Sequence, residues 1–181
     1  LEETAGLTMD PLMLADVDAL RGAVDMWCGG PGAAYRRLIP AAERVAPHDP
    51  GRAAAMLATA AGAQLMDADL RGALASAERA SALTAGRSDS VALAAGLVHG
   101  HALVHLGESR RGRALYEPIL EALEREGATW HWSHLGTLVP GQQLAWLEEF
   151  DRARALLERV VAAARAGGAP GLLPYPVACL S

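Results

Sequence analysis

Residues 147–160 read LEEFDRARALLERV, and residues 106–119 read LGESRRGRALYEPI. Both stretches begin with Leu, continue through acidic residues, place Arg on either side of a small residue, and then add Ala-Leu and a large side chain. Self-similarity at a fixed spacing of roughly 20–50 residues is typical of repeat proteins. The offset from Leu106 to Leu147 falls within that range, so the fold depends on whether the rest of the chain keeps this spacing.

The small residue at the centre of the pattern recurs along the chain. It is found at Ala34, Ala73, Gly112 and Ala153, at intervals of 39, 39 and 41. Four residues later come Leu38, Ala77, Tyr116 and Leu157, and seven residues later come Ala41, Ala80, Ile119 and Val160. Positions i, i+4 and i+7 share one face of an α-helix. The columns therefore predict four equivalent helices.

A second helix in each unit is indicated by its boundaries. Asp10-Pro11 and Asp49-Pro50 each combine an N-cap with a proline at the first helical position. Leu65, Leu106 and Leu147, which are equally spaced, are expected to end these first helices, with a longer turn after Leu65 than after the other two. Gly86, Gly127 and Gly168 are expected to close the second helices, where a left-handed residue is favoured.

These signals predict an all-α fold: a right-handed α-solenoid of antiparallel helix pairs with a period of about 39–41 residues. The expected helices are 11–27, 33–45, 51–65, 70–84, 90–106, 109–125, 132–147 and 150–166, with another beginning near 172. The predicted units of a single domain over 1–181 are 10–46, 47–87, 88–128, 129–168 and a partial fifth, 169–181. An irregular helical bundle is the alternative. Hydrophobic residues make up 51% and aromatic residues 4% of the chain, which suits helices better than sheets.

The charge and the apolar segments limit the partners. The formal net charge of −5 predicts no direct contact with nucleic acid by this segment. No apolar run is long enough to span a membrane. Cys28 and Cys179, in different units, are not expected to form a disulfide, which favours the cytoplasm. The apolar stretch 172–180 suggests a segment cut from a longer protein, and a homodimer through this end is possible.

The repeat resembles tetratricopeptide repeats. Besides the small, large and small positions of the second helix, Gly100 and Gly141 stand twelve positions before Gly112 and Ala153, like the glycine of that family's first helix. The period is longer than that family's usual length of about 34 residues. Units near forty residues with Ala-, Arg- and Leu-rich second helices, such as RALLERVVAAARAGGAPGLLPY, are similar to the sensor arrays of large ATP-binding LuxR- and MalT-type transcriptional regulators.

The resemblance to those regulators implies a non-enzymatic segment between a nucleotide-binding domain and a DNA-binding helix-turn-helix. Neither of these flanking parts is in the chain: there is no GxxxxGK[ST] loop. No cofactor is expected. Two alternatives remain open, a free-standing adaptor scaffold that binds a peptide or protein, and an accessory repeat segment of an enzyme.

A binding groove is predicted on the first helices. With the register set by Leu65, Leu106 and Leu147, position 101 aligns with 60 and 142, and position 105 aligns with 64 and 146. In the family that the repeat resembles, these columns face the concave groove, where a protein, peptide or small-molecule effector binds. The candidate ligand-binding residues are Gln64, His101, His105, Gln142 and Trp146. The alternative is that they are solvated or internally bonded polar residues.

Other candidate sites are weaker. His101 and His105 share a helix face and could bind a metal ion together with further ligands. The nearest candidates are His131 and His134 in the next unit, but His134 would lie roughly 12 Å from His101 along the helix axis. No metal site is therefore predicted. Trp130 and Trp132 either pack across a unit boundary or form a protein interface. The pairs Glu148/Glu149 and Glu124/Glu126 are interpreted as solvated surface, so no catalytic residues are predicted.

Overall fold

The structure, a computed structural model, describes residues 10–126 and 140–181, and within these ranges every regular element is helical. The elements are α2 (Pro11–Val24), η1 (a π-helical turn, Asp25–Gly29), α3 (Pro31–Val45), α4 (Pro50–Met66), α5 (Leu70–Leu83), α6 (Ser90–His105), α7 (Ser109–Glu126), α8 (Pro140–Trp146), α9 (Phe150–Ala166), η3 (a 3₁₀ turn, Pro170–Leu172) and α10 (Pro174–Leu180). The predicted all-α class is confirmed for these residues.

The helices begin where the sequence predicts. The Asp10 side chain accepts a hydrogen bond from the Leu12 backbone N–H, and Asp49 accepts one from that of Arg52 at 3.0 Å. Each of these caps is followed by a proline that has no N–H to satisfy. The local sequence alone therefore fixes the starts of α2 and α4.

The first helices end in turns of equal length. Ala68, Gly107 and Glu148 adopt positive φ angles of 59°, 83° and 61°. The backbone hydrogen bonds that close these turns run from Asp69 N to Gln64 O, from Glu108 N to Leu103 O and from Glu149 N to Leu144 O. Each bond joins positions i and i+5, as in a Schellman motif. The left-handed residues are spaced by 39 and 41, the same intervals as the small-residue column.

The predicted alignment of Leu65 with Leu106 and Leu147 is therefore wrong. Helix α4 continues one residue beyond Leu65, whereas α6 and α8 stop one residue before the other two leucines. The turn after Leu65 is not longer than its equivalents. Because leucine is common in apolar helices, a leucine two positions out of register produced a regular but misleading spacing.

In each unit the two helices cross at a small residue of the first helix, which packs against the residue sixteen positions later on the second helix. A Cβ atom added to Gly100 would lie 2.7 Å from Cε1 of Tyr116. The same conflict would arise between Gly22 and Leu38 and between Gly141 and Leu157. In the second unit, two fully buried alanines, Ala61 and Ala77, fill the equivalent positions. Small side chains therefore allow close packing within each helix pair.

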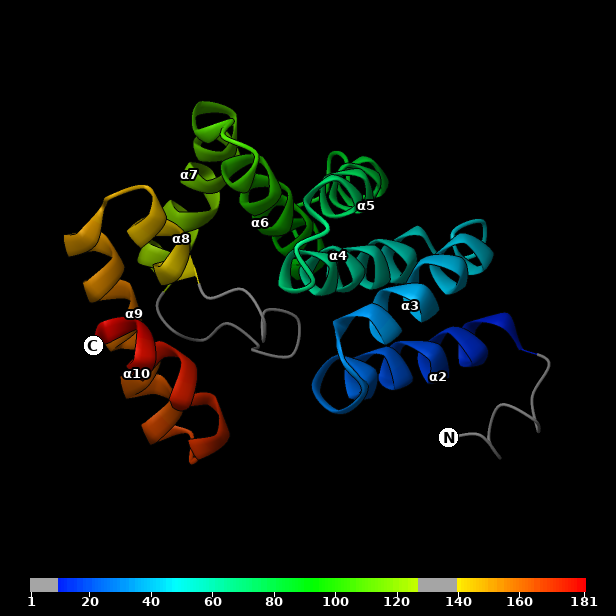
Figure 1. The fold of residues 1–181 in the computed structure, drawn as a ribbon, viewed down its shortest axis with the longest axis horizontal. Coiled ribbons are helices and arrows are strands. Elements are labelled where there is room, and N and C mark those ends of the chain that lie inside the picture. The colour runs from blue at the N-terminus through cyan, green and yellow to red at the C-terminus, as the bar shows by residue number, and fades with distance from the viewer. Residues whose placement is uncertain (1–9, 127–139) are drawn as a thin grey trace.

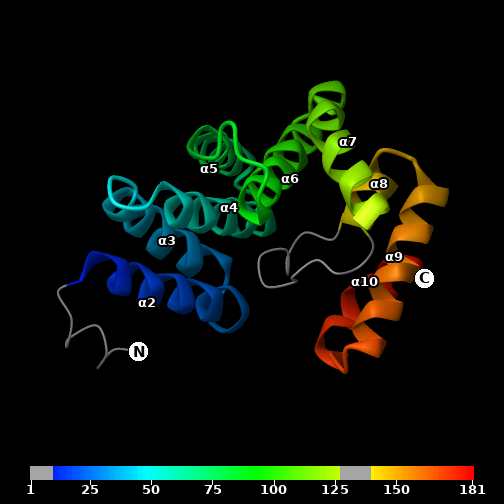
Figure 2. The same ribbon diagram turned by 180° about the vertical axis from the view of Figure 1, so that it is seen from behind.

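Helices that follow one another along the chain pack together from α2 to α7 and from α8 to α10, and α4 also contacts both α2 and α6. One apolar core cluster joins α2, α3, α4, α5 and α6, and a second joins α6, α7, α8 and α9. Figures 1 and 2 show the helices along an arch, with α2 and α3 at one end and α9 and α10 at the other.

Three details depart from the predicted helices. The segment expected as one helix over 11–27 is divided into α2 and the π-helical turn η1. Of the predicted helix 132–147, only α8 falls within the described residues. The last helix starts at Pro174, after η3, and not near 172. In the described part of the chain, no helix is long and apolar enough to cross a membrane, and Cys28 and Cys179 are free thiols, as expected.

Candidate functional site

His101 is the buried centre of a polar cluster between α6 and α8. Its side chain is 5% exposed. Nε2 of His101 lies 2.9 Å from Nε2 of His105, one helical turn later. Nδ1 of His101 lies 3.1 Å from the amide nitrogen of Gln143 on α8. We call His101, His105, Gln143 and Trp146 the histidine–tryptophan cluster.

The hydrogen-bond donors in this cluster can be assigned by counting protons. The Gln143 amide N–H donates to Nδ1 of His101, so His101 carries its proton on Nε2 and donates it to Nε2 of His105. Nδ1 of His105 then holds the remaining proton. Oε1 of Gln143 is buried and has no hydrogen-bond partner among the described residues. The chain of donors therefore runs from the buried amide to the exposed imidazole.

Trp146 covers both imidazoles. Its ring centroid lies 4.7 Å from that of His101 and 4.5 Å from that of His105, and the indole is steeply inclined to both rings. The Trp146 side chain is 41% exposed, and His105 is exposed as well. Edge-to-face contacts of this kind add to the stabilisation from apolar burial. The cluster therefore exposes the indole of Trp146 and the imidazole of His105 to solvent, while His101 and Gln143 beneath them are buried.

The imidazoles are neutral at physiological pH. Burial lowers the pKa of His101 to about 3, and the neighbouring His105 contributes to the lowering. Burial also lowers the pKa of His105. Charging His101 would bury an imidazolium and would place its Nδ1 proton against the N–H of Gln143, which is itself a donor. The site therefore offers neutral polar and aromatic groups to a ligand, and no positive charge.

Gln64 lies outside the cluster, although the sequence placed it in the same ladder. Its side chain is buried: the Ser76 hydroxyl donates to it at 2.7 Å, and its amide donates to Asp69 at 3.0 Å. With the corrected register, Gln64 is equivalent to Leu103 and Leu144, which are core positions. It fixes the turn between α4 and α5. Met66, exposed at the end of α4, is the true equivalent of His105 and Trp146.

Gln142 and Gln143 differ in their roles. Gln142 is half-buried and accepts a hydrogen bond from the Tyr175 hydroxyl of α10. Its neighbour Gln143, which the sequence did not single out, is the residue that bonds to His101. In the second and third units the positions equivalent to Gln143 are occupied by Ala63 and Ala102, both buried. With the correct register, this pair of alanines would have indicated that Gln143 is buried as well.

The remaining candidates do not join the cluster or cannot be placed. Trp130, Trp132, His131 and His134 lie outside the described residues, as do the side chains of Glu124 and Glu126. Glu149 is paired with Arg113 and, at 2.7 Å, with Arg152; Glu148 is exposed at the turn before α9. Within the described ranges, no group of three or more His, Cys, Asp or Glu side chains is arranged to hold a metal ion.

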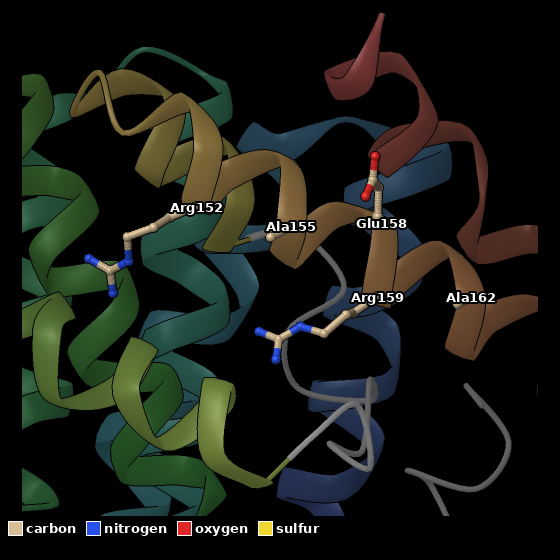
Figure 3. Close-up of a pocket in the computed structure, with 5 residues that line it drawn as sticks. All are labelled: Arg152, Ala155, Glu158, Arg159 and Ala162. Carbon is tan, nitrogen blue, oxygen red and sulfur yellow. The ribbon is translucent and has the colours of Figure 1, made fainter.

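A shallow hollow of about 540 Å³ runs along α9, and none of the residues that line it belongs to the cluster (Figure 3). The residues that line it are Arg152, Ala155, Glu158, Arg159 and Ala162, all from this one helix. Arg152 also pairs with Glu117 of α7 at 3.0 Å. Among the described residues the hollow is formed by one helix face, without the converging walls of a typical ligand pocket, so it is a weaker candidate than the cluster.

Comparisons with known proteins do not assign a function, so the candidate site is argued from the residues of the chain. No protein-family model matches the chain, and no curated protein matches it.

Proposed function

We propose that the chain is a non-enzymatic binding segment, a right-handed tetratricopeptide-like solenoid whose first helices form the binding face. The observation that carries the proposal is the histidine–tryptophan cluster, where exposed aromatic groups stand on a buried, hydrogen-bonded histidine. Aromatic side chains held rigidly are the usual anchors of binding sites, because little conformational entropy is lost when a ligand packs on them.

The chemistry of the first helices of the second, third and fourth units supports an uncharged or weakly polar ligand. In α4, α6 and the described α8, Arg52 is the one Asp, Glu, Lys or Arg residue. It is engaged at the start of α4 by Asp16 at 2.7 Å and by Asp49 at 3.1 Å. Met66, His105 and Trp146 occupy equivalent positions at the opposite ends of these helices. An apolar face with a few hydrogen-bonding groups fits a small effector or an apolar peptide segment.

The solenoid arrangement is supported by the common register of caps, turns and helix crossings, and by the contacts of α4 with both α2 and α6. In solenoids, each repeat packs only on its neighbours. The wider setting, a LuxR-type transcriptional regulator in the cytoplasm, is supported by the sequence resemblance alone. Sequencing the parent gene in both directions tests it: a phosphate-binding loop upstream and a helix-turn-helix downstream are expected. A stop codon after one further helix favours a free-standing adaptor.

Binding at the cluster is tested with fluorotryptophan at position 146, in a chain whose other three tryptophans are changed to Phe. The probes are a library of small aromatic compounds and a library of apolar peptides. We expect a subset to shift the ¹⁹F resonance, and His105→Ala to weaken their binding at least roughly fivefold, about 1 kcal/mol.

Phe150→Ala is the matched control, because Phe150 is an exposed aromatic residue just beyond Trp146 and is not part of the cluster. Binding in this variant should be unchanged. Binding of the same probes that survives both His105→Ala and Trp146→Ala, measured by calorimetry because the second variant lacks the ¹⁹F reporter, would show that the face lies elsewhere.

A further inference from the structure

Helix α2 carries an exposed apolar stripe on the outer side of the first helix pair. The exposed residues are Met13, Leu20 and Val24, with Leu20 57% and Val24 52% exposed. Their spacing, i, i+7 and i+11, places all three on one helix face. Single exposed apolar residues are common on proteins, but a continuous stripe on one helix is a feature of contact surfaces.

The later units show what happens at the positions of Val24 and Leu20, whereas Arg52 and Val91, the equivalents of Met13, are half-buried. The equivalents of Val24 are Ala63, Ala102 and Gln143, none of which is more than 1% exposed. The third-unit equivalent of Leu20, Val98, is also fully buried, and the second-unit equivalent, Thr59, is half-buried. The surface around Val24 is therefore one that the fold covers in the second, third and fourth units and leaves open in the first.

The cover comes from the preceding unit. Gln143, the fourth-unit equivalent of Val24, is hydrogen-bonded to His101 on the first helix of the third unit. A similar contact joins the second unit to the third. A ring nitrogen of His99 on α6 lies 3.1 Å from the hydroxyl of Ser81 on α5, the second helix of the second unit. Helix α4 also contacts both helices of the unit before it, α2 and α3. At each of these junctions a helix pair lies against the next first helix.

The first unit is equipped for the same junction. Asp10-Pro11 repeats the cap of Asp49-Pro50, so α2 can follow a preceding helix as α4 follows α3. The size of the Val24 side chain does not prevent such packing, because the larger Gln143 is buried at the equivalent position of the fourth unit. The contact is heterologous: a first helix meets a different surface, the helix pair before it. Two copies joined symmetrically through α2 would not reproduce this arrangement.

We propose that the Met13–Leu20–Val24 face of α2 is a docking surface for another helix pair of this same repeat type, supplied by the same polypeptide on its N-terminal side. The face is separate from the histidine–tryptophan cluster. It extends the array at one end, whatever the cluster binds.

The test is a full chain with one helix pair duplicated. A second copy of residues 10–48 is placed before Asp10, which recreates the His48-Asp-Pro junction of the native chain. Val24→Cys is introduced in the inner copy alone, with Cys28 changed to Ser in both copies and Cys179 changed to Ser. The thiol reaction rate is compared with that of Val24→Cys in the unduplicated chain carrying the same serines.

We expect the thiol in the inner copy to react at least roughly tenfold more slowly, because local opening would be needed to expose it. Met66→Cys, introduced at an exposed position outside the junction, should react equally fast in both chains. A single cooperative melting transition at a higher temperature is the second expected result.

Two outcomes would overturn the proposal. One is an unprotected thiol, or an inserted pair that melts separately from the rest of the chain. The other is a concentration-dependent dimer of the unduplicated chain that protects Val24→Cys, which would assign the stripe to a second copy of the molecule.

Discussion

At the scale of the residue, His101 is held as a neutral acceptor and donor between two units. Gln143 and His105 use both of its ring nitrogens, and Trp146 covers its ring. A buried polar side chain with both groups satisfied is stabilising, whereas the same side chain charged or unpaired is costly. His101 therefore connects the third unit to the fourth only while it stays uncharged.

The pH dependence of stability follows from this burial. The pKa of His101 in the folded chain, about 3, lies below the ordinary histidine value of 6.5. The unfolded chain therefore binds protons first as the pH falls. The contribution of neutral His101 to stability is fully present above about pH 6.5 and is lost toward pH 3, by up to roughly 1.4 kcal/mol for each pH unit. His101→Gln should flatten this decline in urea unfolding measured from pH 7.5 to 5.

His48→Gln, on an exposed turn, is the control and should leave the decline unchanged. Burial also lowers the pKa of His99, so part of the decline remains in every variant. An identical pH dependence in His101→Gln and the unmodified chain would contradict the buried, neutral cluster.

The sequence predicted His101, His105 and Trp146 as neighbours, and the structure brings them together. It misplaced Gln64, because a two-residue error in register moves a side chain about 200° around a helix. It missed Gln143 because adjacent glutamines look alike in a sequence, while only one of them faces the preceding unit. Side-chain pairing across units depends on the register, which leucine spacing did not determine.

At the scale of the element, the units depend on close crossings between their two helices. A Cβ atom added to Gly112 would lie 2.7 Å from the backbone oxygen of Gly100 and 2.7 Å from Cγ2 of Val104. A backbone atom cannot move away as a flexible side chain can. The i, i+4, i+7 columns predicted the equivalent second helices, and the structure adds that Gly112, their small residue in the third unit, lies close to the first helix.

Gly112→Ala should lower the free energy of unfolding by about 1–2 kcal/mol. The steric cost of overpacking exceeds the gain of up to about 1 kcal/mol that alanine brings to a helix. Gly171→Ala is the control, since a Cβ atom there meets nothing within 4 Å; its effect should stay within about 0.5 kcal/mol. Equal effects of the two changes in denaturant titrations would argue against a close crossing of α6 and α7.

At the scale of the whole molecule, the helices lie along an arch and interact mainly with their neighbours in the chain (Figure 1). Stability in such arrays is close to a sum of unit and junction contributions. An irregular bundle, the alternative raised by the sequence, would instead share one core among distant helices. The period and the caps predicted the order of the helices. They did not predict the arch, because the angle between successive helix pairs depends on how side chains pack at each junction.

The most direct test is to remove the first unit. A chain of residues 49–181 keeps the Asp49-Pro50 cap, so α4 can start without the preceding pair. Circular dichroism should show the helix content expected for the remaining elements, with one cooperative melting transition at a lower temperature. A truncated chain without a cooperative transition, or with little helix left, would show that the helices share a single core and would contradict the repeat array.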